Sequence, residues 1–176
     1  MKLQHRLASP IDIPALTVVM DMAIAGLQRP FLDAAQIESS RMIMGLDRQL
    51  VADETYFVVD ADGAIAGCGG WSRRATLYGG DHTPGRDAAM LDPVTDAARV
   101  RAMYTHPDFA RRGVGRLILQ LCEDAAAAEG FQRLELMATL SGRALYRQCG
   151  YFDLEAISDD RGGVPVPLVR MGKAIG

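Results

Sequence analysis

The chain has 176 residues, of which 49% are hydrophobic and 23% are charged, and its formal net charge at pH 7 is −3. This composition is ordinary for a globular protein with a sizeable core, and we expect a single domain over residues 1–176. The acidic balance argues against a nucleic-acid partner, which would favour a basic surface. We see no signal-peptide pattern and no apolar run of membrane-spanning length, so we expect a cytoplasmic protein without a membrane partner.

Hydrophobic periodicity, helix caps and turn residues predict a mixed α/β chain with β-hairpins at both ends. The expected strands are 3–7, 55–59, 64–71, 99–105, 133–139, 152–157 and 166–171, with a hairpin turn at 60–63. The expected helices are 12–27 with Asp12 as its cap, a second helix capped by Asp33, 114–130 and 141–149. The connection 77–98 is much longer than a hairpin needs. It is either a lid over a site or an excursion that lacks order or contacts a second copy of the chain.

The segment 106–116, His-Pro-Asp-Phe-Ala-Arg-Arg-Gly-Val-Gly-Arg, lies between an expected strand and the most regular expected helix. Its two glycines have no Cβ, so the backbone can bend with its N–H groups exposed and approach a ligand closely. The following helix directs its unpaired N–H groups and positive dipole end to the same point. The arginines add guanidinium groups, whose rigid fork suits phosphate oxygens. We therefore predict a site for a pyrophosphate-bearing ligand, formed by Arg111, Arg112, Gly113, Val114, Gly115 and Arg116.

A second segment, residues 144–152 (Ala-Leu-Tyr-Arg-Gln-Cys-Gly-Tyr-Phe), follows the strand expected at 133–139. Together the two segments resemble the GNAT superfamily of acyl-CoA-dependent N-acyltransferases. In that family an Arg/Gln-x-x-Gly-x-Gly/Ala loop holds the coenzyme A pyrophosphate, and a later helix carries Leu/Phe-Tyr and ends in Gly-Phe or Gly-Tyr. The resemblance extends over the rest of the chain. It implies a central, mostly antiparallel twisted sheet flanked by helices on both faces, with acetyl-CoA as co-substrate and no metal.

Two places depart from the family pattern. Ala110 stands where the family usually has Arg or Gln, which puts affinity in doubt more than identity, because the family's pyrophosphate contacts there are largely backbone N–H groups. Thr139 and Ser141 occupy the region where the family often has an Asn near the pantetheine arm. Either hydroxyl could substitute, and we take Ser141 as the candidate coenzyme contact.

The resemblance also implies direct transfer of the acetyl group from the thioester to a primary amine in a ternary complex. The backbone of Met103, Tyr104 and Thr105 matches the family strand that pairs with the pantetheine amides, and one of its N–H groups is expected to polarise the thioester carbonyl. Tyr146 matches the family tyrosine near the sulfur, where a phenol with a pKa of about 10 can protonate the leaving thiolate. The alternative for Tyr146 is a core aromatic residue of an amphipathic helix.

The general base is marked less clearly. Glu135 lies between Leu134 and Leu136, so it faces away from these leucines and could lie beneath the acceptor amine. A solvated or salt-bridged glutamate is the more common outcome for a charged residue in a strand. His82 and His106 are further candidates, the latter with a turn role before a proline, and a water relay would need none of these residues.

Two other functions fit parts of the sequence. A dinucleotide-binding oxidoreductase would also use Gly113 and Gly115, with Glu135 near the position of a ribose-binding acid, but Ile118 stands at the third glycine of that motif. A non-catalytic module that binds or senses acyl-CoA would keep the glycine loop without needing Tyr146.

The acceptor is a small-molecule or peptide amine that the sequence does not identify, and a homodimer is compatible with the chain. Arg73 and Arg74 would suit an anionic group, whereas the aspartates of the connection 77–98 would suit a polycation. The three cysteines, Cys68, Cys122 and Cys149, lack metal-ligand spacing, so we interpret them as small reduced hydrophobic residues.

Overall fold

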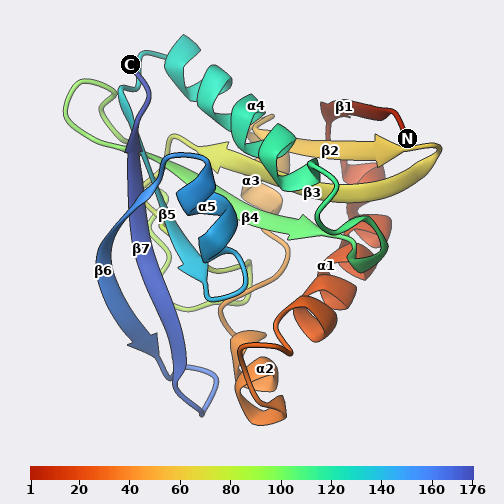
Figure 1. Ribbon diagram of the computed structural model, residues 1–176. Helices are drawn as coiled ribbons and strands as arrows, with labels where there is room; N and C mark the ends of the chain where they lie inside the picture. The colour runs from red at the N-terminus through yellow and green to blue at the C-terminus, as the bar shows by residue number, and fades with distance from the viewer.

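The computed structural model describes all 176 residues. Seven strands form one sheet in the order β1-β2-β3-β4-β5-β7-β6 (Figure 1). Neighbouring strands are antiparallel except β4 and β5, which run parallel. The strands are β1 (Leu3–Leu7), β2 (Tyr56–Ala61), β3 (Ala64–Ser72), β4 (Ala98–Thr105), β5 (Arg133–Thr139), β6 (Phe152–Asp159) and β7 (Val166–Ala174).

Helices cover both faces of this sheet, as the resemblance implies. The helices are α1 (Ile13–Leu27), α2 (Ala34–Ser40), α3 (Arg48–Ala52), α4 (Val114–Ala128) and α5 (Arg143–Gln148). Helices α4 and α5 lie on one face, while α1 to α3 lie on the other (Figure 1). The mixed α/β, mostly antiparallel architecture expected from the resemblance is therefore confirmed.

Each face has its own hydrophobic core. Ile118 and Cys122 of α4 pack against Leu136 of β5 on one side, and Met20 of α1 packs near Cys68 of β3 on the other. Removing this apolar surface from water is the main force that holds the layers together. The buried cysteines are free thiols, and burial raises the pKa of Cys68 to about 12, so it is a neutral core residue as predicted.

Local capping confirms one prediction and corrects another. The Asp33 carboxylate accepts a hydrogen bond from the Gln36 N–H at 2.8 Å and begins α2 as expected. Asp12 does not cap α1 with its side chain. Its carboxylate instead accepts from the Ser9 N–H at 2.8 Å and pairs with Arg6, which holds a 3₁₀ turn at Pro10–Asp12 before the helix.

Several elements also differ from those predicted. Strand β2 continues to Ala61, so the hairpin turn shortens to Asp62 and Gly63, which both have positive φ as a tight two-residue turn requires. Helix α5 begins two residues later than expected. Helix α3 was not predicted, because five residues are too few to show a 3.6-residue period.

Helix α1 corrects the statement that no apolar run reaches membrane-spanning length. Residues Pro10–Leu27 form a stretch of 18 residues with a mean hydropathy of 1.5, which meets that length. In the structure one side of this helix, including Leu16, Met20 and Ile24, is buried against the sheet. The apolar character of the segment therefore has a structural use within the fold.

Strand β4 carries a β-bulge that shapes the centre of the sheet. Cys68 pairs with Tyr104 and Gly70 pairs with Arg101, so Gly69 alone opposes the two residues Ala102 and Met103. Ala102 has a φ of +49°, in the left-handed region that residues with a Cβ rarely adopt. Bulges of this kind redirect side chains and often mark functional sites.

Gly69 makes the bulge possible, which gives a first prediction. A Cβ at Gly69 would lie 2.8 Å from Ile118 Cγ2 and 3.0 Å from Met103 Cγ. Gly69→Ala is therefore expected to lower the free energy of unfolding by about 1–3 kcal/mol, measured by chemical denaturation. Gly26→Ala is the control, because Gly26 lies inside α1 with room for a Cβ and should gain up to about 1 kcal/mol. If both substitutions changed the free energy of unfolding equally, the close packing at Gly69 would not be what requires a glycine there.

Beyond the bulge, β4 and β5 separate. They pair only at Ala98 with Leu134 and at Arg99 with Glu135, near their N-terminal ends. Strand β5 stays paired with β7 along its whole length, and β4 stays paired with β3. The sheet consequently opens between Ala102–Thr105 and the end of β5, and the backbone of β4 has no strand partner on that side.

Candidate active site

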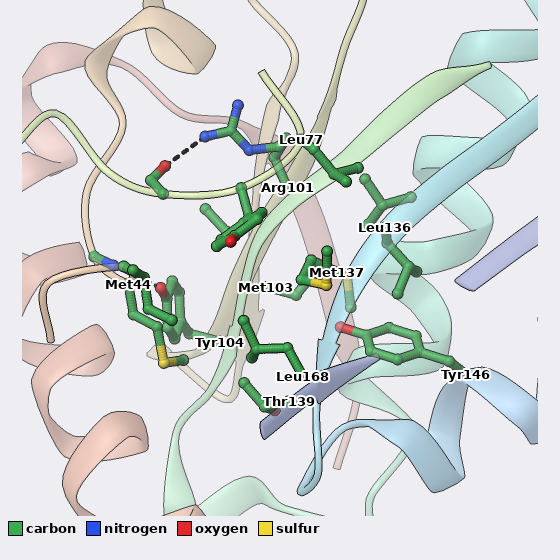
Figure 2. Close-up of a pocket in the computed structure, with 16 residues that line it drawn as sticks. Met44, Leu77, Arg101, Met103, Tyr104, Leu136, Met137, Thr139, Tyr146 and Leu168 are labelled. Atoms are coloured by element: carbon green, nitrogen blue, oxygen red, sulfur yellow. Dashed lines mark hydrogen bonds between the residues drawn. The ribbon is translucent and has the colours of Figure 1, made fainter. Parts of the chain in front are cut away.

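A cavity of about 80 Å³ lies where β4 and β5 separate (Figure 2). It extends through the sheet, because its walls come from β4, from β5 and β7, from the α2–α3 connection, from the loop after β3, and from α5. Most of the lining is apolar. The lining residues are Ile43, Met44, Gly45, Leu77, Tyr78, Gly79, Val100, Arg101, Ala102, Met103, Tyr104, Leu136, Met137, Thr139, Tyr146 and Leu168.

Two buried tyrosines reach this cavity from opposite faces of the sheet. Tyr104 belongs to the core beneath α1, and its hydroxyl accepts a hydrogen bond from the Gly45 N–H at 2.7 Å. Tyr146 belongs to the core beneath α4, and its hydroxyl makes no hydrogen bond within the chain and points toward Met103 and Met137 (Figure 2). Burial raises the pKa of both phenols, so both are protonated at neutral pH. Tyr146 is the phenol whose hydroxyl is free.

The glycine loop lies at the wide end of the same opening. It follows directly from the end of β4 at Thr105 and leads into α4, whose N-cap is Gly113 with a φ of +88°. A Cβ at Gly113 would meet no atom within 4 Å, so the space beside the helix N-terminus is open. Gly115 differs from expectation, because a Cβ there would lie 2.5 Å from Leu145 of α5. Packing of α5 on α4, and not ligand approach, explains that glycine.

The loop is electropositive. Most arginines of the chain pair with a carboxylate, but Arg111, Arg112 and Arg116 take part in no ion pair. The Arg112 guanidinium makes one hydrogen bond, to the Met1 sulfur at 4.0 Å. These three arginines lie in the loop before α4 and in its first turn, and the free N–H groups at the N-terminus of this 15-residue helix add to their positive field. The predicted loop residues are therefore brought together at this helix N-terminus, and we call this group of residues the cradle.

The fold, the opened strand pair and the cradle agree with a comparison of the sequence with known families. The sequence model of the acetyltransferase (GNAT) family matches residues 21–151. The chain belongs to this family. A GNAT acetyltransferase with only one parallel strand pair is not a Rossmann oxidoreductase, so the dinucleotide alternative was wrong.

Solved structures share the fold over nearly the whole chain. An N-acetyltransferase from Rhodopseudomonas palustris has a TM-score of 0.73 at 17% identity, with 99% of this chain and 96% of that chain covered. The PaiA N-acetyltransferase from Thermoplasma acidophilum, in complex with coenzyme A, has a TM-score of 0.66 at 14% identity, covering 99% of both chains. The structure of YncA from Salmonella typhimurium with acetyl-CoA has a TM-score of 0.63 at 15% identity, with 100% of this chain and 95% of that chain covered. A search of curated proteins finds no match.

Within this GNAT fold, Glu135 lies outside the cavity. Its carboxylate pairs with Arg99 at 3.0 Å and with Arg170 at 3.1 Å, so it links three neighbouring strands. This arrangement is the salt-bridged alternative foreseen for a charged strand residue. A role as base stays a prediction that the geometry does not favour, because both carboxylate oxygens face arginines and the residue does not line the cavity.

The histidines also lie away from the cavity lining. His106 has the turn role, since its Nδ1 accepts the Asp108 N–H at 3.1 Å. His82 donates from Nε2 to the Arg41 carbonyl at 2.6 Å. Thr139 lines the cavity, and its hydroxyl is 3.0 Å from that of Ser141, so the two predicted hydroxyls form one polar pair at its edge.

A buried ion cluster beside the cavity was not predicted. Arg101 of β4 and Asp47, the N-cap of α3, pair at 2.8 Å, and their side chains are 2% and 1% exposed. Arg86 also bonds Asp47, at 2.9 Å. Arg101 further donates to the carbonyls of Thr76 and Gly79. The sequence signal for this cluster was Arg101, an arginine inside an otherwise apolar strand. Its partner Asp47 lies 54 residues away, at the cap of a helix too short to predict.

This cluster explains the long connection 77–98. Arg101 and Asp47 fasten its first part to β4 and α3, and Leu77, Tyr78 and Gly79 form one wall of the cavity. The connection is thus an ordered wall of the site. Arg73 and Arg74, which were considered for an anionic acceptor, are instead paired with Glu129 and Asp53.

Proposed function

We propose that this GNAT acetyltransferase transfers an acetyl group from acetyl-CoA to a primary amine while both substrates are bound. The observation that carries this proposal is the cavity between β4 and β5, with Tyr146 in its lining and the cradle of unpaired arginines in the loop that follows the end of β4. The cradle would hold the pyrophosphate. The unpartnered backbone of Met103, Tyr104 and Thr105 would bind the pantetheine arm alongside β4, with Ser141 at its edge.

In the proposed reaction the amine nitrogen forms a bond to the thioester carbon while the carbon–sulfur bond breaks. A backbone N–H of β4 would stabilise the negative charge that develops on the carbonyl oxygen. The Tyr146 phenol would give its proton to the leaving thiolate and recover one from solvent. The cavity lining holds no carboxylate and no histidine. An ammonium entering it loses hydration, which lowers its pKa and releases its proton to water, so no protein base is required.

The cradle is tested by removing its charge. The variant with Arg111→Gln, Arg112→Gln and Arg116→Gln is expected to bind acetyl-CoA about 10- to 100-fold more weakly at low salt, because charge-assisted bonds to phosphate are lost. The difference should shrink as salt screens the charges. Isothermal calorimetry measures both effects. Arg29→Gln is the control, since Arg29 is likewise unpaired but bonds only a carbonyl in α1. Unchanged affinity of the triple variant would reject the cradle.

Thiol release from acetyl-CoA with a panel of amines tests the reaction itself. Release that depends on an amine supports acetyl transfer. Binding of acetyl-CoA without release for any amine would favour the non-catalytic binding module.

A further inference from the structure

We infer that the acceptor is a primary amine with an apolar body and no second positive charge. This inference rests on the proposed acetyl transfer, because it assigns the amine to the part of the cavity on the α2–α3 side.

The first argument is the chemistry of the walls. None of the 16 lining residues is Asp or Glu, so nothing in the cavity can pair with a cation. Met44, Met103 and Met137 are each partly exposed, as is Leu77, and Leu77 packs into none of the three core clusters. Unbranched thioether side chains adapt to apolar ligands of varied shape. Binding an apolar group against these walls is therefore favourable, whereas binding a charged group there costs free energy because the charge is desolvated.

The second argument is the sign of the nearby charge. Arg101 is the charged residue of the lining, and its guanidinium shares the Asp47 carboxylate with Arg86. Two arginines against one carboxylate leave an excess of one positive charge at this wall. Such a charge favours release of the proton from the attacking amine, and it repels an ammonium elsewhere on the acceptor.

An acidic hollow nearby does not supply the missing carboxylate. It has a volume of about 520 Å³, includes Asp87, Asp159 and Asp160, and shares Leu77 and Tyr78 with the cavity as a common wall. Asp159 is already occupied by Arg161 at 2.7 Å and by the Tyr78 hydroxyl at 2.6 Å. The rival possibility is that the acceptor is a diamine whose second ammonium reaches past Tyr78 into this acidic hollow.

Two amines of six heavy atoms each decide between these outcomes. n-Pentylamine and 1,4-diaminobutane differ in whether the far end is a methyl group or an ammonium. We expect kcat/KM, measured by thiol release, to be about 10²-fold higher for n-pentylamine, since the apolar wall must otherwise desolvate an unpaired charge. A wild-type preference for the diamine would overturn the inference and leave acetyl transfer standing. No release with either amine, or with any other, would overturn both.

Substitutions in the cavity walls test whether these walls determine the choice between the two amines. Met44→Glu places a carboxylate in the cavity with little change of shape, and should move the ratio of the two kcat/KM values at least about 10-fold toward the diamine. Met44→Gln has the same shape without charge and should leave that ratio near its wild-type value. Leu77→Glu and Leu77→Gln form a second pair on the opposite wall, should Met44→Glu fail to fold. If neither glutamate shifts the ratio, the acceptor does not lie in this cavity.

Discussion

Replacing Tyr146 with Phe is expected to slow acetyl transfer about 10²-fold, with little change in affinity for acetyl-CoA. The substitution keeps the ring, which packs edge-to-face on Tyr151 with centroids 6.0 Å apart, and removes only the hydroxyl. That hydroxyl makes no hydrogen bond within the chain, so its loss leaves no buried partner unsatisfied. Single-turnover kinetics measures the step directly and prevents slow product release from hiding the effect.

The direction of the Tyr146 pKa supports a role as acid. Burial raises this pKa, so the phenol stays protonated through the neutral range and the rate should not fall as the pH rises toward about 9. A raised pKa makes a phenol a weaker acid in water. In the cavity, however, the leaving thiolate is desolvated as well, and its basicity rises for the same reason. Because both pKa values rise for the same reason, the difference between them changes little, and the Tyr146 phenol can still serve as the proton donor.

Tyr151→Phe is the matched control for this prediction. Tyr151 is buried next to Tyr146, does not line the cavity, and donates its hydroxyl to Glu123 at 3.2 Å. Its loss should lower stability, but the rate per folded molecule should stay near that of the wild type. A Tyr146→Phe variant with the wild-type single-turnover rate would remove Tyr146 from the mechanism, and the protonated Tyr104 would become the candidate to test.

The sequence predicted the features that depend on local patterns. Helix α4 has a clear apolar period, its N-terminal loop has glycines and arginines at recognisable spacing, and the strands alternate or are bounded by turn residues. The run Gly67, Gly69 and Gly70 in β3 also carried information. Glycines inside a strand indicate a bulge or a close backbone approach, and the bulge of β4 lies opposite Gly69.

The sequence did not predict features that depend on distant partners. Glu135 alternates with two leucines as a cleft residue would, and its ion pairs with Arg99 and Arg170 become visible only when β4, β5 and β7 are placed side by side. The cavity wall formed by Met44 and Leu77 likewise depends on segments that have no regular period. The bond between Arg101 and Asp47 is of the same kind, since it joins a strand to the cap of a five-residue helix.

That bond also makes the fold sensitive to the loss of a single charge, because both side chains are almost fully buried. Burial lowers the pKa of Arg101, because removing the guanidinium from water disfavours its charged form, and Asp47 opposes this shift. A buried pair is often no more stable than apolar residues in its place, but removing one partner leaves the other charge uncompensated. Arg86 can turn toward water, since its side chain is 24% exposed, whereas Arg101 cannot.

Asp47→Asn is therefore expected to lower the free energy of unfolding by about 3–5 kcal/mol, measured by chemical denaturation. Asn can still accept the Gln49 N–H that caps α3, so the loss reports the charge of Arg101 and not the cap. Asp81→Asn is the control, because the pair of Asp81 with Arg48 is exposed and its loss should cost at most about 1 kcal/mol. Adding Arg101→Met to Asp47→Asn removes the uncompensated charge and should recover part of the stability. If the two losses simply add, Asp47 does not act through Arg101, and some other contact must fasten the wall of the cavity.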